Sequence, residues 1–446
     1  MAEQHENQHE LMAQQRSQGV TRRAFLERTL ALGLGGGAAL ALLDACGGPA
    51  TSGGNVDITY WNLFGGGDGV RMVQMQDVFT AGHPNVNLKA VTLTWGEPYY
   101  TKVAMSAAGG GSPDAAISHI SRVSTYAAIG FLDPFDLGEL EKVGITENNF
   151  LPGIWQSAQY NGKLYAVPLD THPFVMYYNT DVCQKAGLLN ADGILKPLQG
   201  PDALIDAFKR AQKVTGYMGL TFLGPWRLFS SLYGQQGGEV LTPDGKALAI
   251  DDQKALQALD FMADLTLKSK VCPPVIDSVA LFGSGKAGFY WNGEWEVSTF
   301  ITQKTPFNMI PFPNVFGNHR SEGDSHTFIL PHQDNPDPAR RAAAYQFIAG
   351  MLKQSLTWAQ GGHIPAYLPI TESTPYKNLK PQSNYADVAK DVILDPPAWF
   401  SGSGSLLESQ GDAAFQAVMS GQLTSQQGLQ QFKAALQKLL DTPSPL

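Results

Sequence analysis

The residue whose chemistry the sequence defines best is Cys46. It follows a small residue, Ala45, at the end of an apolar and uncharged segment that runs from Thr29 to Leu43. A cysteine in this position is typical of a lipidation site, although Asp44 is an unusual neighbour for one. The pattern predicts that residues 1–45 are removed and that lipid on Cys46 holds the remaining chain at a membrane surface.

The segment before Cys46 resembles a twin-arginine export signal, whose pattern is Ser/Thr-Arg-Arg-x-Phe-Leu-Lys. Thr21 to Leu26 match this pattern, and Glu27 stands where lysine is usual. The apolar segment is shorter than the ~20 residues that a membrane-spanning helix needs, and Gly35 to Gly37 interrupt it. We therefore expect an exported lipoprotein, by the Tat or the Sec route, with residues 46–56 as a flexible tether.

Two patterns with catalytic associations fall inside this leader. His5-Glu6-Asn7-Gln8-His9 matches the H-E-x-x-H of zinc proteases, and Gly33 to Ala38 imitates a dinucleotide-binding loop. Zinc ligands need a folded core to hold them, and the glycines follow no strand. Neither pattern predicts a site, and we expect no metal and no cofactor.

The charge balance and the cysteines limit the partners and the covalent structure. The chain has 31 Lys and Arg against 40 Asp and Glu, a formal net charge of −9, and no basic block. Nucleic acid is therefore not an expected partner. Besides Cys46, the cysteines are Cys183 and Cys272. An oxidising location permits a disulfide between them, and two buried free thiols are the alternative that we favour.

Four carboxylates outside the leader could do acid–base chemistry: Asp68, Asp170, Glu294 and Glu296. A glycosidase needs two carboxylates at a set separation across the scissile bond, and no spacing in the sequence pairs these four. The chain has no G-x-S-x-G for an acyl-transfer serine, and Gly283 to Ala287 lacks the residues of a phosphate loop. Each carboxylate is more simply an acceptor for ligand hydroxyls or a surface charge.

The elements that must position such groups follow from the hydrophobic pattern. Strands are expected at 57–61, 86–93 and 114–120, with helices between them at 72–79 and 99–108. This alternation predicts an α/β fold with parallel strands. Further helices are expected at 204–211, 344–351 and 429–439.

The sheet predicts where a ligand would bind. Ligands of open α/β sheets lie at the carboxyl ends of the strands. The turns after Trp61, Ile120 and Leu169 are therefore the expected places. They hold the polar residues Asn62, Asp68, His119, Ser121, Arg122, Asp170, Thr171 and His172.

Five sequence blocks follow one another along the chain. They are Val78 to Pro84, Ala108 to Asp114, Gly130 to Pro134, Asn161 to Pro168 continued by Tyr178 to Asp181, and Phe282 to Phe289 continued by Gly293-Glu294-Trp295. In this order and with these gaps they resemble the extracellular solute-binding proteins of sugar ABC importers, the maltose-binding type. The resemblance runs from the first strand nearly to the C terminus. One departure is that the family's Thr-Trp-Asp-Glu pattern is absent before the helix at Pro201.

The resemblance implies a two-lobed periplasmic-binding-protein fold of type II, with the ligand cleft between the lobes. Lobe 1 would comprise residues 57–169 and 312–366, and lobe 2 residues 170–311 and 367–446. Crossing segments are expected at Val167 to Tyr178, at Phe307 to Asn314 and soon after Pro365. The lobes would close on a ligand by rotation about this hinge.

A sugar site needs flat aromatic rings for the C–H faces and planar polar groups for the hydroxyls. By the resemblance, Trp226 and Trp295 match positions that stack on sugar, and His172 or Asp170 would reach the sugar from the hinge. Trp291 is expected in the core instead. The expected ligand-binding residues are Trp61, Asp68, Ser118, Ser121, Arg122, Asp170, His172, Trp226, Trp295 and Trp399. No catalytic residue is expected.

The implied function is the lipid-anchored binding component of a carbohydrate ABC importer, outside the cytoplasm. It would capture a mono- or oligosaccharide as a monomer and deliver it to permease subunits in the membrane. Binding of another polar solute (a polyamine, a glycerol phosphate or a peptide) is the alternative, and an exported carbohydrate-active enzyme is a further one. Tyr177-Tyr178 could suggest a tyrosine iron site, but Asn179-x-Asp181 fits the sugar-family strand better.

Overall fold

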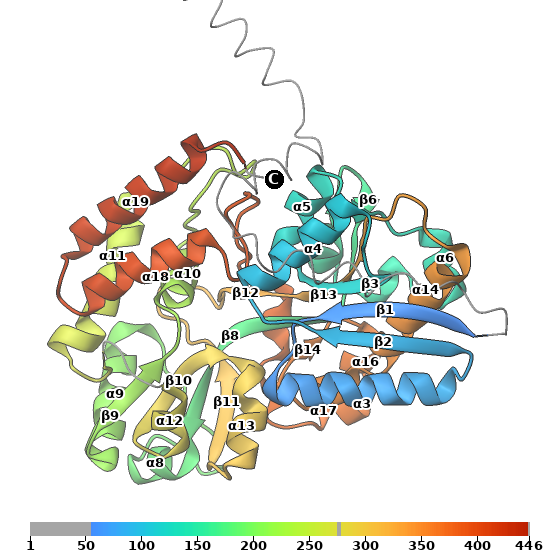
Figure 1. The fold of residues 1–446 in the computed structure, drawn as a ribbon. Helices are drawn as coiled ribbons and strands as arrows, with labels where there is room; N and C mark the ends of the chain where they lie inside the picture. The colour runs from blue at the N-terminus through green and yellow to red at the C-terminus, as the bar shows by residue number, and fades with distance from the viewer. Residues whose placement is uncertain (1–54, 274–277, 445–446) are drawn as a thin grey trace, which may run out of the picture.

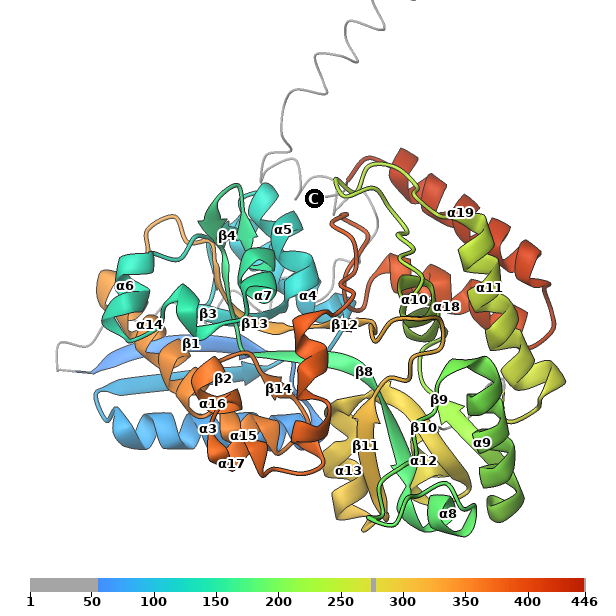
Figure 2. The same ribbon diagram turned by 180° about the vertical axis from the view of Figure 1, so that it is seen from behind.

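The computed structural model describes residues 55–273 and 278–444. The leader, Cys46 and nearly all of the expected tether lie outside the described residues. The described chain folds around two main sheets with helices packed against them (Figures 1 and 2). Among the described helices, none has the length and apolar character needed to cross a bilayer.

The first sheet has the strand order β2-β1-β3-β13-β4, and β7 lies beside β13. β1 pairs in parallel with β2 and β3, while β13 runs antiparallel to β3. Helix α3 buries Met72, Met75 and Phe79, whose spacing of three and four residues puts them on one face. The strands are β1 (Val56–Asn62), β2 (Val86–Thr92), β3 (Ala115–His119), β4 (Leu132–Asp133), β7 (Ala166–Pro168) and β13 (His326–Pro331), and the main helices are α3 (Gly66–Gly82), α4 (Glu97–Gly109), α5 (Ile120–Ala128) and α14 (Pro338–Lys353).

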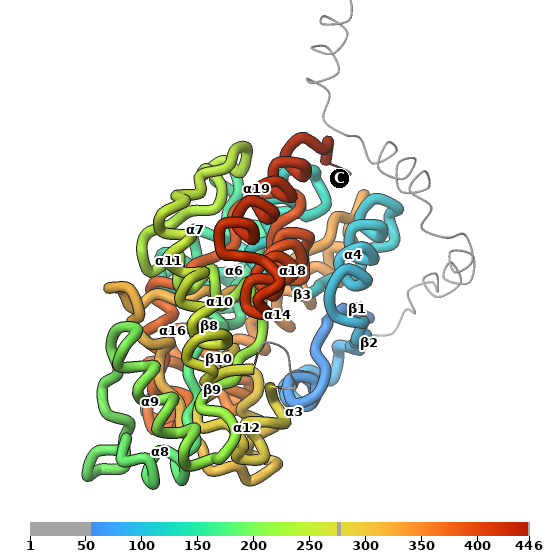
Figure 3. Tube along the Cα trace, turned by 90° about the vertical axis from the view of Figure 1, so that its left-hand side faces the viewer, coloured from blue at the N-terminus to red at the C-terminus, as the bar shows by residue number. Residues whose placement is uncertain are grey.

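The second sheet has the order β11-β8-β10-β9, and two short strands, β12 and β14, pair with the beginning of β8. All ten residues of β8 are buried, so it runs through the interior for its whole length. Figure 3 faces this half of the molecule, where α10, α11 and α18 pack together. The strands are β8 (Asp170–Asn179), β9 (Met218–Phe222), β10 (Ala287–Gly293), β11 (Phe307–Pro311), β12 (Gly323–Asp324) and β14 (Ile364–Pro365), and the main helices are α9 (Gly200–Thr215), α10 (Pro225–Gly234), α11 (Asp252–Ala263), α18 (Leu406–Met419) and α19 (Ser425–Asp441).

Shorter elements complete the described chain. The strands β5 and β6 pair with each other as a separate ribbon. The remaining elements are α6 (Leu137–Lys142), η2 (Glu147–Asn149), α7 (Pro152–Ser157), β5 (Gln159–Tyr160), β6 (Lys163–Leu164), α8 (Thr180–Lys185), η3 (Asp264–Lys268), α12 (Ser278–Gly283), η4 (Glu294–Glu296), α13 (Val297–Thr302), α15 (Ser355–Ala359), α16 (Leu368–Thr371), α17 (Thr374–Lys377), η5 (Gln382–Asn384) and η6 (Ala386–Lys390).

Two large hydrophobic cores accompany the two sheets, and a third, smaller cluster includes Val175 and Tyr177 of β8. The buried residues of the first core fall within 58–169 and 328–367, and those of the second within 174–315 and 400–436. We call the parts of the chain around these cores the first and the second lobe. Three short segments lie between the cores. Asp170–Pro173 is the beginning of β8, and Gly323–His326 and His363–Pro365 lie beside it. We call these three segments the central strip, and the chain passes between the lobes through the first two.

Candidate functional site

A cavity of about 340 Å³ opens beside the central strip. This volume falls in the range of ~300–1,000 Å³ that is usual for small-molecule sites. The lining residues come from both lobes and from the strip, so a ligand held there would touch all three. They are Leu63, Phe64, Gly65, Asp68, Trp95, His119, His172, Leu223, Arg227, Trp295, His326, His363 and Ser403.

The first lobe contributes the carboxyl ends of two neighbouring parallel strands. The turn after β1 contains Phe64, whose backbone N–H donates to Asn62 Oδ1 at 3.1 Å, and leads into Asp68 in the first turn of α3. His119 is the last residue of β3, and its Nδ1 contacts the Tyr100 hydroxyl. Because β1 lies between β2 and β3, these ends meet at one edge of the sheet.

The second lobe contributes a half-buried indole, that of Trp295 in η4. A Cβ on Gly293 would lie 1.8 Å from Cζ3 of this indole, so glycine is the residue that lets the ring fold back on the end of β10. The Arg227 guanidinium carbon lies 5.5 Å from the ring centroid. The His172 ring stands nearly perpendicular to it, with 6.1 Å between ring centroids. These contacts fix the orientation of Trp295 before any ligand arrives.

A second indole, that of Trp95, lines the cavity from the first lobe. It lies in the loop before α4 and is 49% exposed. A Cβ on Gly404 of the second lobe would lie 3.3 Å from its ring, so the two lobes approach each other closely here. The cavity therefore has an indole on each lobe.

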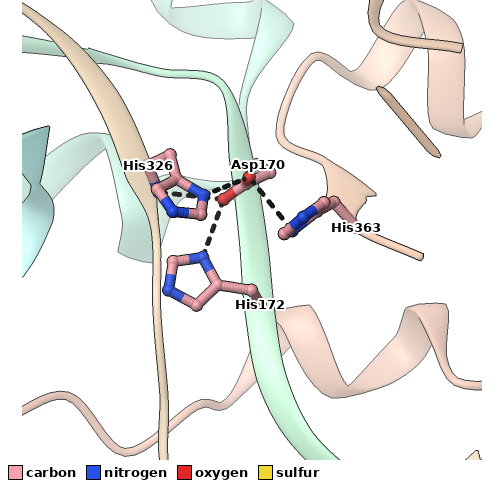
Figure 4. A group of neighbouring side chains, drawn as sticks. All are labelled: Asp170, His172, His326 and His363. Carbon is pink, nitrogen blue, oxygen red and sulfur yellow. Dashed lines mark hydrogen bonds and ion pairs between the residues drawn. The ribbon is translucent and has the colours of Figure 1, made fainter. Parts of the chain in front are cut away.

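Asp170 is the fully buried centre of the polar cluster drawn in Figure 4. Its Oδ1 accepts from the backbone N–H of His326 at 2.9 Å and from His172 Nδ1 at 3.0 Å. Its Oδ2 accepts from His326 Nδ1 at 2.7 Å and from Trp358 Nε1 at 2.6 Å. Burial would favour the neutral acid, but the histidines around it hold the pKa of Asp170 well below its usual value. The carboxylate therefore orients the imidazoles that face the cavity.

His363 lies among three carboxylates. Its Nε2 is 3.2 Å from Asp68 Oδ1, and its Nδ1 is 3.1 Å from Glu294 Oε1 and 3.4 Å from Asp170 Oδ2. Burial opposes the imidazolium, yet the acids raise the pKa of His363 well above its usual value. Burial likewise raises the pKa of Glu294 to about 7. One positive ring thus faces more than one negative group.

Two other imidazoles of the cavity, those of His119 and His172, are neutral at pH 7. Burial lowers the pKa of His172 to about 3 and lowers that of His119 well below its usual value. A neutral imidazole has one donor and one acceptor nitrogen. In both rings Nδ1 already has a protein partner, Asp170 for His172 and Tyr100 for His119, so Nε2 is the nitrogen that can bond to a ligand hydroxyl.

Arg227 is held by two acids, Glu408 of the second lobe and Glu322, which immediately precedes the central strip. Its Nη1 donates to Glu322 Oε1 at 2.7 Å and its Nη2 to Glu408 Oε1 at 3.0 Å. Burial raises the pKa of Glu322 to about 7, because the attraction of Arg227, which Glu408 shares, does not offset the cost of burying the carboxylate. Arg227 is thereby fixed at the cavity wall with much of its charge already matched.

This raised pKa predicts a pH dependence of stability. The pKa of Glu322 is near the ordinary value of 4.5 in the unfolded chain, whereas the folded side chain stays protonated up to about pH 7. The folded state therefore loses stability between these two pH values, by on the order of 3 kcal/mol in total. Glu322→Gln should make the fall smaller, because the buried Glu294 still contributes its own part. Urea unfolding at pH 4.5, 5.5, 6.5 and 7.5 measures it, with the exposed Glu139→Gln as a control that keeps the wild-type slope. An equal slope in Glu322→Gln and wild type would contradict the prediction.

Three of the residues expected from the sequence line the cavity: Asp68, His172 and Trp295. Asp170 does not line it, because it is fully buried behind the histidines. Ser118 is also buried, and its hydroxyl donates to the His119 carbonyl at 3.1 Å. Both support the site without reaching its surface.

Ser121 and Arg122 contact a loop of the second lobe and not the cavity. The Ser121 hydroxyl donates to Asp324 and accepts from the backbone N–H of Ser403 at 3.3 Å. Arg122 Nε donates to the Ser403 carbonyl at 2.9 Å. Because Ser403 lines the cavity, both residues position a part of its wall.

The remaining expected tryptophans are placed differently from the expectation. Trp226 is 1% exposed in the second core, nearly parallel to Phe415 at 6.4 Å, so its face is occupied by protein. Trp399 is half-buried and packs against the same core. Trp61 packs against the first core with Lys102 Nζ 5.1 Å from its ring centroid. Trp291 is fully buried in the second core, as expected.

Several residues of the cavity wall were not among the ligand-binding residues expected from the sequence: Trp95, His119, Arg227, His326, His363 and Ser403. His119 was one of the polar residues in the turns where a ligand was expected, and this position is the signal in the sequence that points to it. His326 and His363 lie 156 and 193 positions after Asp170. Strand pairing alone brings them together, and no spacing in the sequence reveals it.

Cys183 and Cys272 are free and buried in the second core. The favoured alternative of two unpaired thiols is therefore confirmed, and they form no disulfide. Burial raises the pKa of Cys183 to about 12 and also raises the pKa of Cys272. Both thiols are therefore unreactive in the folded protein.

Comparison with known sequences gives two named relatives. The arabinooligosaccharide-binding protein of Bacillus subtilis is 27% identical over 239 residues, which are 52% of this chain and 53% of that protein. The mannitol-binding protein of Pseudomonas aeruginosa is 28% identical over 121 residues, 27% of each chain. The match thus spans about half the length of the first relative and about a quarter of the second.

Comparison with solved structures confirms the two-lobed α/β fold. The GacH receptor of Streptomyces glaucescens, solved unliganded and with acarbose, has a TM-score of 0.72 at 21% identity, covering 87% of this chain and 99% of the receptor. A substrate-binding protein of Listeria monocytogenes in complex with cycloalternan has a TM-score of 0.74 at 18% identity, covering 87% and 100%. Residues 74–387 match the family described as bacterial extracellular solute-binding protein. The chain belongs to this family of extracellular solute-binding proteins.

Proposed function

We propose that this protein is the sugar-binding component of an ABC importer and that the cavity between its lobes takes a mono- or oligosaccharide. The observation that carries the proposal is the composition of this one cavity. Trp95 and Trp295 offer apolar faces from opposite lobes, while His119, His172 and Arg227 offer hydrogen-bonding groups around them. Flat rings combined with a few fixed polar groups suit a ligand that has C–H faces and hydroxyl edges.

The names of the relatives support a polyhydroxylated ligand. They refer to an arabino-oligosaccharide and to mannitol, and the similar structures hold acarbose and cycloalternan. The other solutes fit the cavity less well. A polyamine needs several acids, whereas Asp68 is the one carboxylate among the described lining residues and lies 3.2 Å from His363. A phosphate ester needs more than one free cation, and Arg227 already binds two acids.

We further propose that binding closes the lobes, 57–169 with 312–366 against 170–311 with 367–446, about the central strip. The separate hydrophobic cores support two lobes, because each lobe keeps its own core during a rotation. Phe312 and Val315 pack in the second core, so the boundary expected at residue 312 falls after residue 315 instead. A ligand shifts the balance toward the closed form only through contacts that are present in that form. Trp295, Arg227 and Ser403 of the second lobe would supply such contacts.

The remaining parts of the proposal concern the setting of the protein. Lipid on Cys46 would hold the protein on the outer face of the cell membrane after twin-arginine export, as a monomer that docks on permease subunits. The leader and the cysteine that follows it support this placement. Labelling of cells with a radioactive fatty acid tests it, because Cys46→Ser should abolish the label.

The binding function is tested by the melting temperature of the purified protein with maltotriose, arabinotriose, mannitol, spermidine and glycerol 3-phosphate. A ligand at 100 times its Kd adds ~2.7 kcal/mol of stability. We expect a sugar to raise the melting temperature, with one ligand bound per chain and a smaller radius of gyration in X-ray scattering. Stabilisation by spermidine or glycerol phosphate alone would contradict the proposal, and so would cleavage of the oligosaccharides, which would indicate an enzyme.

A further inference from the structure

Four side chains of metal-binding type meet in the central strip. Asp170, His172, His326 and His363 are all buried, and each offers a ligand atom within 4.8 Å of those of the others (Figure 4). We propose that these four residues bind one divalent first-row transition metal ion, and that Zn²⁺ suits them best. This goes beyond sugar binding and differs from the expectation of no metal.

The strand register explains why residues so far apart in sequence converge. Asp170 and His172 are alternate residues of β8, so their side chains point to the same face. Pro365 pairs with Asp170 and Ile364 with Thr171, which puts His363 next to His172 on the neighbouring strand. His326 begins β13, and its backbone N–H donates to Asp170 Oδ1 at 2.9 Å. All four ligands therefore lie on well-paired backbone.

The donor atoms select the class of ion. Three imidazole nitrogens with one carboxylate oxygen form a set that zinc, copper, iron and nickel prefer, whereas calcium and magnesium prefer oxygen ligands. Four such ligands suit the tetrahedral geometry of zinc. In Figure 4 the three imidazoles surround the carboxylate of Asp170, and the Nδ1 atom of each lies 2.7 to 3.4 Å from one of its oxygens, so an ion would bind by replacing these contacts.

The surrounding charges favour a cation. Asp68, Asp170 and Glu294 all lie within 3.4 Å of His363. Both carboxylate oxygens of Glu294 and both ring nitrogens of His363 are buried without a well-directed hydrogen bond in the described part of the chain. Such groups are costly when they lack a partner. An ion on His363 and Asp170 would replace these poorly directed contacts with coordination bonds.

Neighbouring residues hold the ligands as a metal site requires. The Trp358 indole donates to Asp170 Oδ2 at 2.6 Å, and its ring stacks on that of His363 at 4.5 Å and 12°. The Phe64 ring packs edge-on against His326 at 4.9 Å. Supporting contacts of this kind orient the ligands of a metal ion and raise the affinity of the site for that ion. His172, His326 and His363 also line the cavity, which gives the ion a path from solvent.

The test uses the untagged full chain in which His5→Gln and His9→Gln remove the two histidines of the leader pattern. After treatment with EDTA, the protein is titrated with ZnCl₂ by calorimetry, and retained zinc is measured by elemental analysis. We expect one equivalent per chain. His326→Gln and His172→Gln should each weaken zinc binding by at least about tenfold. His332→Gln is the matched control, because His332 also contacts carboxylates, Asp133 and Asp334, but lies outside the cluster.

A second measurement covers the case in which a variant fails to fold. Co²⁺ added to the EDTA-treated parent chain should give the strong visible absorption of a tetrahedral site, and Zn²⁺ should remove it. The proposal is overturned if the parent retains no zinc, if Co²⁺ stays octahedral, or if folded His326→Gln binds zinc as tightly as the parent. Sugar binding by EDTA-treated protein is measured in parallel, so that a failure of this proposal is distinguished from a failure of the sugar-binding function.

Discussion

Replacing Asp170 with alanine should lower the free energy of unfolding by about 3 to 5 kcal/mol in the presence of EDTA, the usual cost of breaking a buried charged pair. The carboxylate accepts four hydrogen bonds, from His172, twice from His326 and from Trp358. All four donors remain in the interior after the substitution and lose their acceptor. Urea unfolding followed by circular dichroism measures the loss.

The matched control for this substitution is Asp57→Ala. Asp57 also accepts hydrogen bonds, from Lys89 at 2.6 Å and from Asn87 at 3.0 Å, but its side chain is 54% exposed. Water replaces these partners when the carboxylate is removed. The urea midpoint of Asp57→Ala should therefore match that of wild type. If Asp170→Ala also matched wild type, the carboxylate would not be holding the central strip together.

Replacing Trp295 with alanine should weaken sugar binding by tenfold or more. An indole that stacks on a sugar contributes on the order of 1 kcal/mol beyond the apolar area it buries, and a tenfold change in Kd corresponds to about 1.4 kcal/mol. The ring is already oriented by Gly293 and Arg227, so the substitution removes a preformed surface. Calorimetric titration with arabinotriose or maltotriose, whichever raises the melting temperature, measures the effect.

Trp399→Ala is the control for the stacking argument. Trp399 is likewise half-buried in the second lobe, but it packs against Phe400 and the second core and does not line the cavity. Its substitution should leave Kd unchanged. An unaltered titration of Trp295→Ala, or an equal loss in both variants, would remove Trp295 from the binding surface.

Local pattern predicted individual strands and helices, whereas the two-lobed arrangement was implied by the family resemblance. The strand expected at 57–61 is β1, and the helix expected at 72–79 is the buried face of α3. These elements depend on alternation and helical spacing, which are properties of neighbouring residues. Trp226 illustrates the limit of matching positions to a family. Together with Phe229 and Tyr233 it forms one apolar face of α10 at helical spacing, and this face packs into the core.

The site was predicted only in part, because several of its residues are brought together by contacts between distant parts of the chain. Trp295 could be found because the local block Gly293-Glu294-Trp295 resembles the family pattern, and the structure explains the glycine, whose missing Cβ makes room for the ring. His326 and His363 could not, because their proximity to Asp170 is produced by strand pairing over long sequence separations. Trp95 lies in an exposed loop whose position depends on how the two lobes meet.

Because the two native cysteines are buried and unpaired, dyes can be attached at chosen positions to follow the movement of the two lobes. Cys183 and Cys272 are 0% and 2% exposed, so a maleimide dye would leave both untouched in the native protein. With Cys46 replaced by serine, new cysteines at Leu137 in the first lobe and Leu267 in the second, which are 60% and 42% exposed, would take the dyes selectively. Energy transfer between a fluorescent donor and acceptor at these positions would turn the protein into an optical sensor of its own ligand.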